Sequence, residues 1–194
     1  TVAAVAGALL LILTGVLSVE SGFSYVDLNT LGVLIGMMLF VAVVKNSGIF
    51  EYIAIKAAKI AKGRPWPLMV LFALITAVLS AFLDNVTTVL LIGPMTLAIT
   101  SMLRINPIPF FMTQIMASNI GGTATLIGDP PNIMIGSAAG LSFTDFITNT
   151  GVAVLFVLAA TIVCFYFIYG RKLHVEPEAM DCRIPKLVLQ PMIE

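Results

Sequence analysis

Hydrophobic residues fill most of this chain, and the charged positions divide it into long uncharged runs. The main runs cover residues 1–19, 28–44, 65–83, 85–103, 105–128, 130–144 and 146–170. A membrane-spanning helix needs about 20 consecutive apolar residues, and several runs reach that length. The pattern predicts an all-α polytopic membrane protein. It places scaffold helices at 1–19 and 28–44 and a further crossing at 146–170.

The overall composition supports the same class. Hydrophobic residues make up 59% of the chain and charged residues 10%, whereas soluble proteins average about 45–50% and about 25%. The mean hydropathy is +1.07. Because the formal net charge is zero, nothing points to nucleic acid as a partner. We therefore expect a multi-pass integral protein of the cell (inner or plasma) membrane, with the lipid bilayer as its surroundings.

Basic residues crowd the connection between Lys45 and Arg64, which the positive-inside rule places in the cytoplasm. Within it, residues 48–62 have two faces and predict an interfacial amphipathic helix. The charged face carries Glu51, Lys56, Lys59 and Lys62, and the opposite face carries Ile49, Phe50, Ile53 and Ile60.

Residues 65–104 contain two apolar runs that only Asp84 separates. Two full crossings normally need a connection of about 2–8 residues. Charge alone leaves both topologies open, because either one returns Arg104 to the cytoplasm. Polar, non-helical backbone at membrane depth must be surrounded by protein or water. We therefore expect a re-entrant helical hairpin with its tip at residues 84–88.

Residues 108–140 predict a broken helix. A straight helix of this length would span about 50 Å, against a hydrocarbon core of roughly 30 Å. Its centre reads "GGTATLIGDPPN", in which glycines and two prolines disfavour helix. We expect two half-helices, at 108–120 and 131–140.

Both breaks offer an aspartate, an asparagine and threonines. The candidate substrate- and ion-binding residues are Asp84, Asn85, Thr87, Thr88, Gly121, Gly122, Thr123, Thr125, Gly128, Asp129, Pro130, Pro131 and Asn132. No lysine, arginine or histidine lies in the uncharged runs, and an ionised aspartate at the bilayer centre costs about 2.5–3.5 kcal/mol. The carboxylates must be protonated, hydrated or neutralised by a cation.

These alternatives suit a site that loads protons or sodium, with no other cofactor. A sodium site would use Asn85, Thr88, Gly122 and Asn132, and half-helix N-termini suit an anionic substrate. In the structural alternative, Asp84 and Asp129 only cap helices and the glycines only permit close packing.

The polar motifs also carry a family resemblance. "DNVTT" (84–88) and "GGTATLIGDPPN" (121–132) resemble the hairpin tip and the broken helix of the ion transporter superfamily. The closest branch is that of the ArsB/NhaD permeases and the P protein, with the related citrate-transporter-like domain. Dicarboxylate members carry serine where this chain has Asp84, which favours the ArsB/NhaD branch. The resemblance implies two inverted repeats, alternating access and homodimers.

This chain contains one hairpin and one broken helix. We therefore expect residues 1–173 to be the N-terminal transmembrane repeat, and residues 174–194 to be a cytoplasmic linker toward a second repeat of the same polypeptide.

The predicted function is half of an ion-coupled secondary transporter, an antiporter or other permease and not an enzyme. It would move an anion or a cation, and arsenite, sodium and organic anions all stay open as substrates. A structural membrane subunit or a channel is an alternative, although residues 28–44 and 146–170 lack the polar stripe of a pore. An intramembrane aspartyl protease would need glycine at position 126, where the chain has Leu126.

Overall fold

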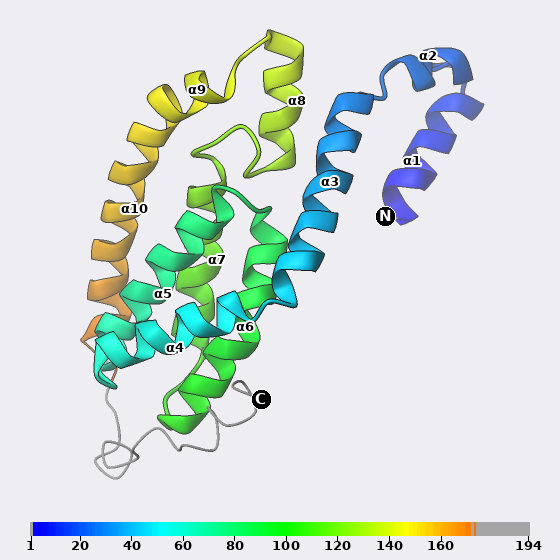
Figure 1. Ribbon diagram of the computed structural model, residues 1–194. Helices are drawn as coiled ribbons and strands as arrows, with labels where there is room; N and C mark the ends of the chain where they lie inside the picture. The colour runs from blue at the N-terminus through cyan, green and yellow to red at the C-terminus, as the bar shows by residue number, and fades with distance from the viewer. Residues whose placement is uncertain (1, 172, 174–194) are drawn as a thin grey trace.

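The computed structural model describes residues 2–171 and 173, and its regular elements in this part are all helical (Figure 1). Within the described residues, three helices are long and apolar enough to cross a membrane: α3 (Leu28–Lys45), α6 (Asn85–Met102) and the continuous helix Phe143–Gly170. The prediction of an all-α polytopic membrane protein is confirmed. The predicted linker, 174–194, lies outside the described residues.

The N-terminal segment differs from the expected single helix over residues 1–19. Helix α1 (Val2–Leu13) ends early, and a short helix α2 (Val19–Ser24) follows before α3. Gly15 has a φ of 73°, a left-handed conformation that glycine adopts without strain. Ser18 then caps α2 by accepting a hydrogen bond from the Ser21 amide at 3.1 Å. In Figure 1, α1 lies apart from the other helices.

Helices α5 (Pro65–Ser80), α6 and α7 (Ile108–Gly122) form the central bundle, and α4 (Ile49–Ala61) lies across the side that α5 and α6 form (Figure 1). The face that α4 buries is an alanine stripe with one aromatic residue: Phe50, Ala54, Ala57 and Ala61. Of the predicted apolar face, Ile49 and Ile60 are exposed. Small alanine side chains let α4 approach the bundle closely, and the larger isoleucines remain outside.

Helices α5 and α7 run parallel and approach very closely. The Ser80 hydroxyl donates to the Ser118 carbonyl at 2.7 Å. A Cβ atom added to Gly121 would lie 2.1 Å from the Ala77 carbonyl oxygen, so only glycine fits there. The first half-helix is therefore packed directly against the first arm of the hairpin.

The second half-helix, α8 (Pro130–Ala139), packs against α3. Asp27 caps α3, and its pKa is lowered, first by a hydrogen bond from the Thr30 hydroxyl and then by the Ser137 hydroxyl of α8. After α8 come α9 (Phe143–Phe146), the π-helix η1 (Ile147–Gly151), α10 (Val152–Phe165) and the π-helix η2 (Tyr166–Gly170). Helix α10 packs against α7.

Candidate functional site

The hairpin tip is the short turn between α5 and α6. Asp84 is the N-cap of α6, and its Oδ1 accepts a hydrogen bond from the Thr87 amide at 2.8 Å. Oδ1 of Asp84 therefore has the helix-capping role that the structural alternative assigned to this residue. One carboxylate oxygen suffices for the cap, so the role does not conflict with ion binding by the other.

The break between α7 and α8 is held to the hairpin by Thr125. Its hydroxyl donates to the Ala81 carbonyl in the hairpin turn and accepts a hydrogen bond from the Gly128 amide at 3.1 Å. On the other side, Asn132 donates its amide N–H groups to the carbonyls of Thr125 (2.9 Å) and Gly122 (3.2 Å). These contacts give the unwound segment the partners that a helix would have supplied.

Glycines bring backbone carbonyls together at the same place. A Cβ atom on Gly128 would lie 2.5 Å from the Gly122 carbonyl oxygen and 2.7 Å from that of Ser80. A Cβ atom on Gly122 would lie 2.9 Å from the Gly128 carbonyl oxygen. Carbonyl oxygens are suitable ligands for hard cations. The glycine pattern thus concentrates acceptors at the junction of hairpin and break.

The two aspartates meet at this junction. Asp129 occupies the N-cap position of α8 without a side-chain capping bond, and Pro130 and Pro131 fill the first turn. The hydrogen bond from Thr125 to the Ala81 carbonyl brings the two segments that carry Asp84 and Asp129 together. Capping therefore accounts for Asp84 but leaves the position of Asp129 unexplained.

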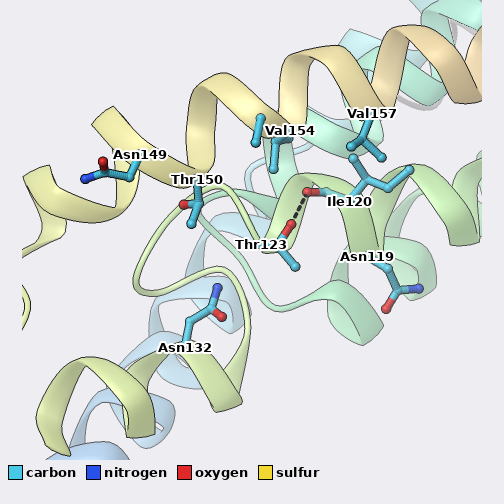
Figure 2. Close-up of a pocket in the computed structure, with 9 residues that line it drawn as sticks. Asn119, Ile120, Thr123, Asn132, Asn149, Thr150, Val154 and Val157 are labelled. Carbon is cyan, nitrogen blue, oxygen red and sulfur yellow. Dashed lines mark hydrogen bonds between the residues drawn. The ribbon is translucent and has the colours of Figure 1, made fainter. Parts of the chain in front are cut away.

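Two clefts flank the junction. The larger has a volume of about 610 Å³, and its polar lining comprises Asn119, Thr123, Asn132, Asn149 and Thr150. The smaller, of about 250 Å³, is lined by Asn85, Val86, Val89, Leu90, Ile115, Ser118 and Asn119. Asn119 lines both. Figure 2 shows Asn132 and Thr150 pointing toward the loop of the break from opposite sides.

Among these lining residues, Asn119, Asn149 and Thr150 were not singled out from the sequence. Asn119 accepts a hydrogen bond from the Asn85 amide at 2.9 Å and so links α7 to the hairpin. Asn149 and Thr150 lie in η1, and π-helical segments are frequent at functional sites. The Thr150 hydroxyl donates to the Phe146 carbonyl at 2.6 Å and approaches that of Ala124 in the break at 3.4 Å.

The remaining predicted residues are distributed around the junction. Thr123 is exposed, and its hydroxyl donates to the Ile120 carbonyl at 2.7 Å (Figure 2). Thr88 is fully buried, and its hydroxyl oxygen has no hydrogen-bond partner. Among the candidate sodium ligands, Asn132 and Gly122 are directly bonded, whereas Asn85 pairs with Asn119 beside the smaller cleft.

Comparison with known proteins gives a consistent picture. Residues 1–189 match the model of a family described as citrate transporter. An uncharacterized transporter of Mycobacterium tuberculosis is 48% identical over 145 residues, which cover 75% of this chain and 34% of the relative. The 46 kDa membrane protein of Mycobacterium leprae is 41% identical over 182 residues (92% and 42%). The human P protein is 40% identical over 159 residues (77% and 19%). The chain spans about a third of the first of these relatives.

Proposed function

The chain belongs to the citrate transporter family of membrane transporters, and on that premise we propose that it forms half of a proton- or sodium-coupled secondary transporter. The transported substrate is a small ion or an organic anion. The other half is a second repeat of the same polypeptide, because this chain accounts for about a third of its mycobacterial relative. The two halves enclose one site, and two such proteins form a homodimer.

The observation that carries the proposal is that Asp84 and Asp129 each stand at the N-cap of a helix after an interruption, and that Thr125 joins the two interruptions through the Ala81 carbonyl. Two carboxylates that repel each other, with no basic residue in the surrounding uncharged runs, are stabilised when a proton or a cation binds between them. Binding of the coupling ion therefore lowers the energy of the junction. Release of the ion raises it again, which is the property that a coupled carrier needs.

In this proposal, different groups around the junction bind the coupling ion and the substrate. Backbone carbonyls of Gly122 and Gly128 and the Thr88 hydroxyl supply neutral oxygen ligands for the coupling ion. The first turn of α8 after Asp129 presents the positive end of a helix dipole, which suits an anionic substrate. Amide groups of Asn85, Asn119 and Asn132 orient the substrate in the two clefts.

Alternating access follows from the packing. The hairpin and the first half-helix are joined through Gly121, Ser80 and Thr125, so they move as one unit. In the proposed motion, this unit moves relative to the scaffold helices α1 and α3. The contact between α8 and α3 is the surface along which the broken helix meets the scaffold. Exposure of the site then switches between the two sides of the membrane.

The test is gradient-driven flux in proteoliposomes that contain the complete parent protein. Wild type, Asp84→Asn and Asp129→Asn are compared for arsenite, sodium and organic anions, under proton and sodium gradients. Asp27→Asn is the matched control, since Asp27 also caps a helix but lies away from the junction. We expect both junction variants to insert normally and lose coupled flux, while the control retains it. Unchanged flux in both junction variants would contradict the proposal.

A further inference from the structure

Polar side chains continue from the junction into the interior of the central bundle. Besides Ser118, six polar residues on the three facing helices are at most 1% exposed: Thr76, Ser80, Thr88, Thr96, Thr100 and Gln114. The neighbouring interior is apolar, with Leu68, Met69, Phe72 and Phe110 at similar burial. We call the six residues the polar column.

The helix register sets the members of the column at successive levels. The Ser80 hydroxyl of α5 donates to the Ser118 carbonyl of α7, and Thr76 lies one turn before Ser80 on the same face of α5, as Gln114 lies one turn before Ser118 on α7. From the third helix, the Thr96 hydroxyl accepts a hydrogen bond from the Gln114 amide at 2.7 Å. Gln114 and Thr96 therefore form one level of the column, and Thr76 lies between Ser80 and the start of α5 on the buried face of that helix.

Thr88 and Ser80 lie toward the junction, and Thr100 lies one turn beyond Thr96. The Thr100 hydroxyl donates to the Thr96 carbonyl at 2.7 Å, which places it on the same side of α6. The column thus extends from the hairpin tip toward the opposite end of the bundle, where α6 ends and α7 begins.

The hydrogen bonding of this column is incomplete. Four buried side-chain atoms among the described residues have no partner, and three of them belong to the column: the hydroxyl oxygens of Thr76 and Thr88 and the Oε1 atom of Gln114. Buried polar groups in proteins are nearly always paired, with ordered water as the usual partner where protein groups do not suffice. Water fits this chemistry, because it can donate to the Gln114 carbonyl and exchange a hydrogen bond with the Thr76 hydroxyl.

We propose that the polar column holds a file of water molecules that carries protons between the junction and the opposite end of the bundle, where α6 ends and α7 begins. Successive levels are about 5.4 Å apart, a separation that one water spans with two hydrogen bonds of about 2.8 Å. Each hydroxyl or water accepts a proton on one side and releases one on the other. Gln114 is a positioning residue, since its amide is anchored to Thr96 and its carbonyl orients the water.

The hydration of the column can be tested independently of transport. In the complete parent protein with Cys164 and Cys182 replaced by alanine, a thiol is introduced by Thr76→Cys or, as the matched control, by Ala73→Cys. Both positions are on α5 and 0% exposed. Infrared spectroscopy of the S–H stretch then follows exchange into D2O. We expect exchange at position 76 to be at least about tenfold faster, because a thiol in a dry core exchanges only on local opening. Equal, slow exchange at both positions would overturn the proposal.

The proton-carrying role rests on the proposed function and needs a flux assay. Thr76→Val and Gln114→Leu are compared with Thr161→Val, which removes an exposed hydroxyl bonded to its own helix. We expect the column variants to lower proton-driven flux about tenfold. The column variants should retain substrate exchange at equal pH on both sides of the membrane. Thr161→Val should retain both proton-driven flux and exchange.

The possible outcomes separate this inference from the proposed function. Unchanged proton-driven flux in the column variants, or an equal loss of flux and exchange, would overturn the proton path. Flux driven by sodium alone would do the same and leave the proposed function intact. If Asp84→Asn has no effect, the proposed function itself fails, whatever the result of the thiol exchange.

Discussion

The close contact between Gly121 and Ala77 predicts that Gly121→Ala lowers the free energy of unfolding. A Cβ atom at position 121 would lie 2.1 Å from the Ala77 carbonyl oxygen and 2.6 Å from its carbonyl carbon. These are backbone atoms, so no side chain can rotate away. To accept Gly121→Ala, α5 and α7 must separate until the contact exceeds 3.0 Å. That movement would also stretch the nearby Ser80–Ser118 hydrogen bond.

The size of the effect follows from two opposing terms. Overpacking of this kind costs about 1–3 kcal/mol, and a rigid backbone contact belongs at the upper end. Replacing a helical glycine by alanine returns at most about 1 kcal/mol. The net expectation is a loss of about 2 kcal/mol in the free energy of unfolding.

The assay is thermal unfolding of the purified parent protein, with Gly36→Ala as the control. Gly36 lies within α3, and a Cβ atom there would meet nothing within 4 Å. We expect Gly121→Ala to lower Tm by several degrees and to reduce flux, whereas Gly36→Ala leaves Tm unchanged or raises it. If the two variants unfold alike, the close approach of α5 and α7 is not as described.

Three further predictions concern single polar contacts. Asn132→Ala should cost about 1–3 kcal/mol in thermal unfolding, because it leaves the carbonyls of Gly122 and Thr125 without a donor; an unchanged Tm would count against it. Asn119→Ala removes the hydrogen bond from Asn85, worth roughly 1 kcal/mol, so Tm should fall slightly and flux should fall about fivefold; normal flux would contradict its role. Thr30→Val should raise the pKa of Asp27 toward its ordinary value. Because folding lowers this pKa, the ionised carboxylate stabilises the fold at neutral pH, and this stabilisation is lost on acidification. In Thr30→Val, the free energy of unfolding should therefore fall less on acidification than in the wild type.

The uncharged runs and the glycine–proline cluster were sufficient to predict most helices. Charges mark where α3 begins and ends, and the break between α7 and α8 lies where two prolines follow Asp129. The division of residues 1–19 was missed because Gly15 and Ser18 are isolated within an apolar run. The alanines through which α4 packs on the bundle were not predicted, because amphipathic patterns emphasise large side chains.

Within the site, the sequence was informative about which residues are polar but not about their partners. Asp84 and Asp129 stood out because a carboxylate in an apolar run is costly. Asn119 carries no such signal, since a single amide in a helix becomes significant only when the tertiary register places it opposite Asn85. The unpartnered oxygens of Thr76 and Gln114 likewise emerge from packing alone.

The central claim is that Asp84 and Asp129 together hold the coupling ion, and carbodiimide labelling of the complete parent protein tests it most directly. The reagent modifies protonated carboxyl groups in apolar surroundings, and mass spectrometry locates the adduct. We predict labelling at Asp84 or Asp129 that decreases as pH rises or as sodium is added, and that Asp27→Asn leaves unchanged. Labelling at neither residue, or labelling that responds to neither ion, would contradict the account.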